Sequence, residues 1–304
     1  MKDILMMIFF LTFGVLTLNA FAEPIDSPPD KQSALSVHMD GSGVQASAAT
    51  DGATQSPQSA SKSPGSASFS LLVSSIYNFR GLNVFSETSQ GDQNALFSPS
   101  FTRTVFHPGL WFKYAGFFQI NGDNRAYLVE SGVGAEQNIA AGFKYDFSSK
   151  LTALTSLTYR FYPFASPRIT GVTWPSWLEP AVGIRWTPKR DIRLDLQLSY
   201  NIPIQERMRD QRYMYTLFSI AKAFQVHPRV ALDLESAFGY KLYADPLIWQ
   251  DTIFDITFCA SLPFRISEQL KLVPATNAAW GYMTGTGFGD QYMIYFSLAI
   301  VAEF

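Results

Sequence analysis

Few residues in this sequence could perform covalent chemistry. The chain has three histidines, and His107 is the one that falls within an expected strand. Antiparallel pairing of the first two expected strands would bring His107 near Ser74, which would place a base beside a nucleophile. No third group that would orient the histidine is identifiable. The pair suggests a membrane-embedded lipid hydrolase as a minor hypothesis, and an ordinary polar lining residue is the simpler interpretation of His107.

Charged side chains form a larger set of functional candidates. They recur on the polar face of segments in which apolar and polar residues alternate. Against lipid, each charge would cost about 2 to 4 kcal/mol at the midplane, so these side chains must face water or one another. The sequence predicts fourteen pore-lining residues: Arg80, Arg103, Lys113, Lys144, Arg160, Glu179, Arg185, Arg193, Asp195, Asp233, Glu235, Lys241, Asp255 and Lys271. Two interpretations stay open, a transverse field that filters small polar solutes and salt-bridged layers that fill a closed barrel.

The remaining candidates indicate neither a metal site nor a cofactor. Cys259 is the single cysteine, which excludes an intramolecular disulfide and any multi-cysteine metal site, and we interpret it as a small filling residue. His38 has no ligand partner at a useful spacing. Gly285, Gly287 and Gly289 precede an expected strand rather than a helix, so a phosphate-binding loop is excluded. The sequence predicts no catalytic residue, no metal and no cofactor.

The composition shows which kind of element must position the charges. Of 304 residues, 47% are hydrophobic, 15% are aromatic and only 16% are charged, against about 25% charged in an ordinary soluble protein. Beyond the N-terminus no apolar run approaches the roughly 18 to 20 residues of a membrane helix. Apolar and polar residues must therefore be finely interleaved, which is typical of β-structure. The net charge of −2 shows no basic excess that would indicate nucleic-acid binding.

The N-terminus resembles an export signal followed by a segment without a core. Lys2 precedes an apolar stretch, and Ala20-Phe21-Ala22 is a small-x-small tripeptide suited to cleavage before Glu23. We interpret residues 1–22 as a signal peptide. Residues 23–68 contain no aromatic residue and are rich in Ser, Ala, Gly and Pro, so we expect a disordered periplasmic segment.

The remaining residues, 69–304, show alternation with period two. Between residues 191 and 201, apolar side chains such as Ile192 and Leu194 fall on one face, while Arg193 and Asp195 fall on the other. The expected strands are 69–80, 99–114, 116–121, 135–147, 150–162, 177–187, 191–202, 211–226, 229–243, 251–264, 269–283 and 290–304. Their connections alternate between long and short. The sequence predicts an all-β fold, a transmembrane antiparallel up-and-down β-barrel of about 12 strands, with a range of roughly 10 to 14.

Aromatic residues support a barrel over a soluble sandwich. Phe147, Trp186, Phe224, Phe264 and Phe304 stand at the short-turn ends of expected strands. A second group stands at the long-loop ends: Phe79, Phe161, Tyr200, Tyr240, Trp280, Tyr282 and Tyr292. Two girdles at the membrane interfaces explain this placement.

Two details of this strand assignment stay open. Residues 99–134 also allow a strand over 109–120, followed by a turn and a strand near 125–131. Pro108, Pro180 and Pro274 fall inside expected strands, where each implies a bulge, a strand end or a misplaced boundary.

Two short motifs carry a resemblance to known families. The last strand ends in alternating apolar residues with a terminal Phe304, and it is similar to the C-terminal signal of bacterial outer-membrane barrels. This resemblance implies recognition by the barrel-assembly machinery of a Gram-negative outer membrane. The segment Tyr77-Asn78-Phe79-Arg80-Gly81 resembles a Tyr-x-Phe-Arg-Gly element of the TorF-type putative porins. That resemblance implies a porin-like protein and names no substrate.

The combined expectation is an outer-membrane porin-like channel for passive or weakly selective diffusion of small polar solutes. Its expected partners are outer-membrane lipid and lipopolysaccharide, the barrel-assembly machinery and the solutes. A non-conducting structural or adhesive barrel is the first alternative, and a lipid-modifying barrel enzyme that uses His107 is the second.

Overall fold

The computed structural model describes residues 66–76, 78–80, 82–83, 95–105, 109–119, 136–163, 175–189, 191–243, 252–283 and 291–304. The predicted signal peptide and residues 23–65 of the predicted disordered segment lie outside these ranges. The elements, in chain order, are β1 (Ala67–Ser74), β2 (Asn78–Phe79), β3 (Leu82–Asn83), β4 (Leu96–Thr104), β5 (Leu110–Gln119), β6 (Glu136–Ser148), β7 (Leu151–Phe161), β8 (Ser176–Lys189), β9 (Ile192–Pro203), the 3-10 helix η1 (Glu206–Gln211), β10 (Tyr213–His227), β11 (Val230–Tyr243), β12 (Thr252–Ser261), β13 (Phe264–Arg265), β14 (Leu270–Met283) and β15 (Gln291–Glu303). In this described part of the chain, no helix is long and apolar enough to cross a membrane.

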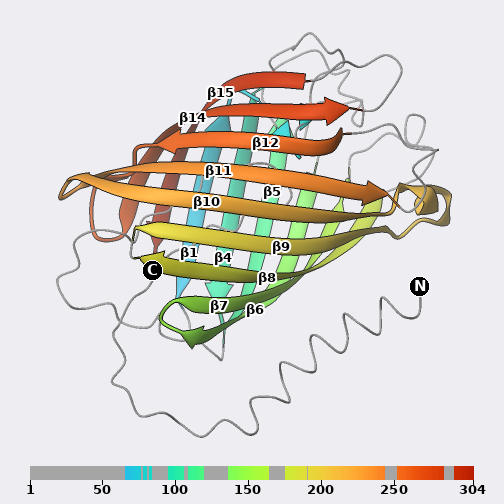
Figure 1. Ribbon diagram of the computed structural model, residues 1–304, viewed down its shortest axis with the longest axis horizontal. Helices are drawn as coiled ribbons and strands as arrows, with labels where there is room; N and C mark the ends of the chain where they lie inside the picture. Colours follow the sequence, from blue (N-terminus) through green and yellow to red (C-terminus); the bar gives the residue numbers. More distant parts are fainter. Residues whose placement is uncertain are drawn as a thin grey trace, which may run out of the picture. The chain divides into compact units, whose positions relative to one another are not determined.

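The long strands close into one antiparallel barrel. Each pairs with its neighbour in the sequence, and β1 pairs with β15 to complete the ring. The two-residue β13 pairs with β11 and β14, as β12 does, so it occupies the same position in the ring. The result is the predicted closed barrel of twelve strands, in which β9 to β12 cross in front of β1, β4 and β5 (Figure 1). Closure leaves no unpaired strand edge.

Side chains on the barrel alternate between an apolar outer face and a more polar lumen. On β10, Phe218 and Ile220 are exposed while Ser219 and Ala221 are buried. The pattern continues to the last strand, where Ile294 is 69% exposed. Apolar surface on every strand would be unstable in water, whereas lipid solvates it. The distribution is that of a barrel built to sit in a membrane.

The connections confirm the predicted alternation of long and short. Tight turns join β6 to β7, β8 to β9 and β10 to β11, whereas η1 lies in a longer connection at the other end of the barrel (Figure 1). The five aromatic residues predicted for the tight-turn interface are all exposed: Phe147, Trp186, Phe224, Phe264 and Phe304. At the long-loop end, Tyr240, Tyr282 and Tyr292 are exposed as well.

The region around Ala115 differs from the first assignment of strands. The turn expected at Ala115 is wrong, because Ala115 lies inside β5 and pairs with Ser100 of β4. The alternative strand over 109–120 is nearly the observed β5. At the start of β5 the chain passes close to β6: a Cβ on Gly109 would lie 2.2 Å from the backbone oxygen of Lys144, so only glycine fits there.

Two of the three prolines that we expected to disturb a strand lie inside strands without ending them. Pro180 of β8 pairs with Leu157, and Pro274 of β14 pairs with Leu298. Neither position shows the register shift that we expected. Between Leu178 and Ala181, the regular pairing of β8 with β9 is interrupted. Pro180 lies in this interruption, where the N–H group that it lacks is not needed for a ladder hydrogen bond. Pro108 lies outside the described residues.

Candidate functional site in the barrel lumen

The first connection turns into the barrel. The strand expected over 69–80 ends at Ser74, and the chain then forms a small hairpin in which Asn78 and Phe79 of β2 pair with Asn83 and Leu82 of β3. We call β2, β3 and Arg80 between them the inner hairpin. Arg80 has a φ of 49°, a left-handed conformation that a non-glycine residue adopts only where its surroundings hold it.

One side of the inner hairpin rests against β14 and β15. Ile76, just before the hairpin, is 5% exposed and packs with Ala279, Met293 and Tyr295. The side-chain amide of Asn78 donates to the hydroxyl of Tyr295 at 3.3 Å. These contacts hold the base of the hairpin inside the lumen, against β15, which pairs with β1, and against β14 beside it.

The tip of the inner hairpin reaches the opposite wall. Arg80 Nη2 lies 2.6 Å from Glu179 Oε1, and Arg80 Nη1 donates to the Tyr213 hydroxyl at 2.5 Å. Glu179 is on β8, the fifth strand from β1 around the ring in one direction, and Tyr213 is on β10, the fifth in the other. The guanidinium carbon also lies 4.2 Å from the ring centroid of Tyr215, a cation–π contact. Arg80 therefore spans the lumen.

A chain of buried ion pairs continues from Glu179 along the wall. Arg160 of β7 donates to Glu179 Oε2, and its Nε lies 3.6 Å from Glu136 Oε1. Glu136 also accepts from the Tyr162 hydroxyl at 2.8 Å and from the Asn138 amide at 2.8 Å. Each carboxylate thus has several donors, which is what a charge removed from water requires.

On the other side of Arg80, a side-chain hydrogen bond joins β10 to β12 across the intervening strand β11. The Tyr215 hydroxyl of β10 lies 3.1 Å from Asp255 Oδ2 of β12, although β11 separates these strands. Gly239 of β11 makes this contact feasible, because a Cβ at that position would lie 2.1 Å from the Tyr215 hydroxyl. We use the name hairpin layer for the whole set: Arg80, Glu136, Arg160, Glu179, Tyr213, Tyr215 and Asp255.

Two titratable side chains at the level of the hairpin layer, Arg80 and Tyr162, lie outside the membrane-spanning strands and have shifted pKa values. Burial alone would lower the pKa of Arg80, but the Glu179 carboxylate raises it, and the net shift is upward. Burial, followed by the Glu136 carboxylate, raises the pKa of Tyr162 well above its ordinary range. Arg80 therefore stays cationic, and Tyr162 stays a protonated donor to Glu136.

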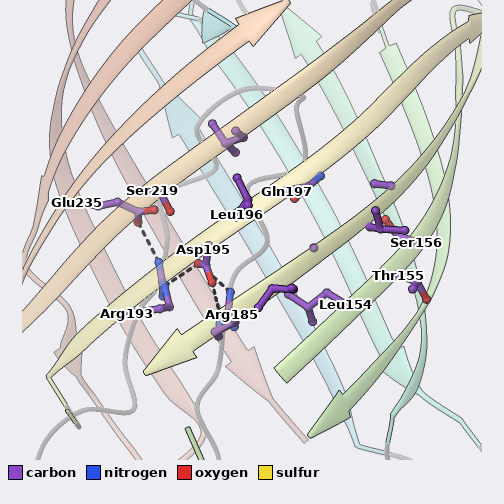
Figure 2. Close-up of a pocket in the computed structure, with 15 residues that line it drawn as sticks. Leu154, Thr155, Ser156, Arg185, Arg193, Asp195, Leu196, Gln197, Ser219 and Glu235 are labelled. Atoms are coloured by element: carbon purple, nitrogen blue, oxygen red, sulfur yellow. Dashed lines mark hydrogen bonds and ion pairs between the residues drawn. The ribbon is translucent and has the colours of Figure 1, made fainter. Parts of the chain in front are cut away.

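A second group of charges lies along the wall of β8, β9 and β11 (Figure 2). Arg185 holds Asp195 through two hydrogen bonds, of 2.7 and 3.1 Å, from directly opposite positions on β8 and β9. Arg193 lies between Asp195 and Glu235, at 3.0 and 3.2 Å. The Arg193 contact to Glu235 passes over Ala221 of β10, a small residue that pairs with both. We call these four residues, Arg185, Asp195, Arg193 and Glu235, the wall ladder.

The wall ladder borders a pocket, and two of its side chains, Arg193 and Asp195, are more exposed than the ion pairs of the hairpin layer. Ser156, Gly183, Gln197 and Ser219 are among the residues that line this pocket. The side chain of Asp195 is 21% exposed, against 6% for Glu179. Asp195 is therefore more accessible to solvent than the carboxylate at the centre of the hairpin layer.

Thirteen of the fourteen predicted pore-lining residues are placed inside the barrel. Nine belong to the two groups just described or lie beside them: Arg80, Arg160, Glu179, Arg185, Arg193, Asp195, Glu235, Asp255 and Lys241, whose ammonium lies 5.6 Å from the Tyr213 ring. Asp233 is buried near the ladder, and Lys271 lies 3.4 Å from Glu303. Lys144 pairs with Asp146 at 3.2 Å, and Lys113 is half-buried between the exposed Phe112 and Tyr114.

Arg103 is the exception, and its predicted place in the lumen is wrong. Arg103 is exposed and shares a face of β4 with Phe101, which is 44% exposed. The error arose because the alternation of β4 was continued through a turn that the structure places after Thr104. Arg103 pairs with Ala67 at the end of β1, close enough to the tight-turn end for its long side chain to reach the interface.

Some residues of the site were missed from the sequence. Tyr213 and Tyr215 alternate with Met214, so a lumen-facing pair of aromatics was not distinguishable from a lipid-facing one. Glu136 stands on the same face as Asn138 at the start of an expected strand, and this polar alternation could have identified it. Gly239 carried no signal, because its role depends on side chains from two other strands.

The hydrolase hypothesis receives no geometric support from the strand register. Ser74 pairs with Leu96, at the far end of β4 from Thr104, and its hydroxyl donates to the backbone oxygen of Phe296 at 3.3 Å. The register that would set Ser74 opposite residue 107 is not the one observed. His107 itself lies outside the described residues.

Comparison with known proteins gives fold-level likenesses only. No family model matches the chain, and no curated protein matches its sequence. Among solved structures, a KdgM porin is 9% identical over 78% of this chain and 99% of its own, with a TM-score of 0.49. An outer membrane channel of Pseudomonas putida F1 is 10% identical over 79% and 96%, with a TM-score of 0.47.

One further structure with a similar fold is not named as a porin or a channel. LpxR from Salmonella typhimurium is 9% identical over 77% of this chain and 99% of its own, with a TM-score of 0.45. At identities this low and TM-scores this small, the likenesses carry no conclusion about function. None of these structures bears the TorF-type name, so that resemblance stays a prediction.

Proposed function

We propose that the protein is an outer-membrane channel for small polar solutes, with a lumen constricted by the inner hairpin. The observation that carries this proposal is the position of Arg80, which leaves one wall of the barrel and pairs with Glu179 on the other. A barrel with an apolar outer face and a charged interior is suited to a membrane and to polar passengers.

The charges at the constriction give it a physical basis for weak selection. Glu179 lies between Arg80 and Arg160, and Asp255 lies beyond Tyr215, so opposite charges stand at one level of the lumen. Such a level creates a field across the path, so a solute with separated partial charges can align with it. Because the charges are paired, the layer has little net charge to repel either ion.

The wall ladder provides the second surface along this path. Its arginines and carboxylates are held by one another, yet they border a pocket with hydroxyl and amide side chains. Groups of this kind replace part of a solute's hydration as it passes. A polar passenger would thus meet the ladder and the hairpin layer in succession.

Planar bilayers test the proposal. Purified, folded protein should produce discrete conductance steps, while the same preparation after heat denaturation should produce none. Arg80→Ala and Glu235→Ala should each alter ion selectivity. The first removes a charge from the hairpin layer, and the second removes one from the wall ladder. Silent membranes, despite a folded and heat-modifiable barrel, would contradict the proposal.

One observation favours a second candidate, a non-conducting structural barrel. Arg80 and Glu179 of the hairpin layer are nearly inaccessible to solvent, and the neighbouring Lys241 is only 2% exposed, so this level of the barrel is closely packed. A permanently closed layer would make the barrel a scaffold whose outer loops bind partners. Silent membranes together with a folded barrel would be the result that this candidate predicts.

A further inference from the structure

One lumenal carboxylate stands apart from the paired charges around it. Asp233 of β11 is 5% exposed, and among the described residues neither of its carboxylate oxygens has a hydrogen-bond partner. It lies two residues from Glu235, on the same face of the strand and nearer to the tight turn between β10 and β11. By contrast, the ladder carboxylates Asp195 and Glu235 each accept from an arginine.

The cations near Asp233 are engaged by other acids. The charged groups that face it are Arg193, Glu235 and Lys271. Arg193 forms ion pairs with Asp195 and Glu235, and the Lys271 ammonium lies 3.4 Å from Glu303. The thiol of Cys259 also lies within the electrostatic reach of Asp233, but a thiol is a poor donor.

This arrangement leaves one negative charge without compensation. The wall ladder holds two arginines and two carboxylates and is neutral, so an ionised Asp233 adds a net charge of −1 at this level. A buried carboxylate without donors is costly, and proteins retain such groups where a ligand or function compensates the cost. Two free oxygens on one carboxylate match a cation that offers two N–H donors.

We propose that Asp233 is a binding site for small monovalent organic cations, of the guanidinium or primary ammonium class. The proposal rests on the proposed function, because it makes Asp233 the residue that gives the channel a preference for cations. A cation that donates to both oxygens of Asp233 replaces the missing donors without breaking the pairs of Arg193 or Lys271. Glu235 adds a second negative charge beside the bound cation.

The first measurement is ion selectivity in planar bilayers under a salt gradient. Asp233→Asn removes the charge with little change in shape, and the cation-to-anion permeability ratio should fall at least about fivefold. Asp233→Glu keeps the charge and should retain the preference. Asp191→Asn is a matched control, because the Asp191 side chain is 42% exposed and pairs only weakly with Lys222, at 3.9 Å; it should leave the ratio unchanged.

The second measurement does not require conduction. Isothermal titration of the detergent-solubilised protein with methylguanidinium chloride should show saturable binding that Asp233→Asn abolishes. Tetramethylammonium chloride, a cation of similar size without N–H donors, should give no saturable binding. Circular dichroism confirms that each variant keeps its β-structure.

The two measurements separate the two ideas. Saturable binding that depends on Asp233 in a protein that never conducts would support the site and contradict the channel. Conduction with a permeability ratio unaffected by Asp233→Asn would support the channel and overturn the site. The absence of saturable methylguanidinium binding to the wild-type protein would also overturn the site.

Discussion

The hairpin layer and the wall ladder use the same residue types in different ways. Both pair arginine with carboxylate inside the barrel. The hairpin layer joins opposite walls through Arg80, and its ion-pair side chains are almost fully buried. The wall ladder joins strands that are close in the ring. The side chains of Arg193 and Asp195 are 15% and 21% exposed to solvent. The first arrangement constricts the lumen, and the second lines it.

The difference shows what strand register can and cannot determine. Arg185 and Asp195 meet because a tight turn sets them opposite each other on adjacent strands. Arg80 meets Glu179 only because a connecting segment leaves the wall and crosses the barrel. Contacts of the first kind follow from local alternation, whereas contacts of the second kind depend on tertiary packing.

The largest expected effect comes from Glu179. Glu179→Ala leaves Arg80 and Arg160 buried beside each other, and unfolding free energy should fall by about 3 to 5 kcal/mol. Asp195→Ala, in the more exposed ladder, should lower it by about 1 to 3 kcal/mol. Urea unfolding in phospholipid vesicles, followed by tryptophan fluorescence, measures both. Equal losses would remove the distinction between a buried layer and a more exposed ladder.

Two glycine-to-alanine substitutions, one in each region, should give smaller losses of stability that can also be compared. A Cβ on Gly239, in the hairpin layer, would lie 2.1 Å from the Tyr215 hydroxyl and 2.5 Å from Asp255 Oδ2. Gly239→Ala should therefore separate Tyr215 from Asp255 and cost about 1 to 3 kcal/mol.

Gly183 provides the matched control beside the ladder. A Cβ there would lie 3.0 Å from the backbone oxygen of Leu196, with its next contacts at 3.6 Å. Gly183→Ala should cost less than Gly239→Ala in the same urea experiment. A larger cost for Gly183→Ala would contradict the packing described for the hairpin layer.

The smallest effect is expected outside the lumen. Arg103→Ala removes a charge from the outer face of β4, so single-channel conductance and ion selectivity should stay within experimental error of the wild-type values. Lys113→Ala, on the inward face of β5, is the comparison. A change in selectivity for Arg103→Ala as large as that for Lys113→Ala would return Arg103 to the lumen.

The sequence predicted the wall of the barrel well, for identifiable reasons. Alternation fixes which face a strand side chain occupies, so Arg193 and Glu235 lie on the inward face that the pattern predicts, while their role in a pore stays a prediction. The same rule failed at Arg103, where the boundary between β4 and β5 was misplaced. It also extended β1 to residue 80, because alternation does not show where a chain leaves the sheet. The packing of Ile76 against Met293 and Tyr295, which turns the chain inward, involves residues more than two hundred positions apart.

The most direct test of the account is the single-channel conductance of Arg80→Ala beside that of the wild-type protein. Arg80 ties the inner hairpin to Glu179 and Tyr213, so its removal should release the constriction and raise the conductance severalfold. Arg103→Ala, measured in the same bilayers, should match the wild type. Equal conductance for Arg80→Ala and wild type, with both barrels folded, would contradict the claim that the inner hairpin constricts the channel.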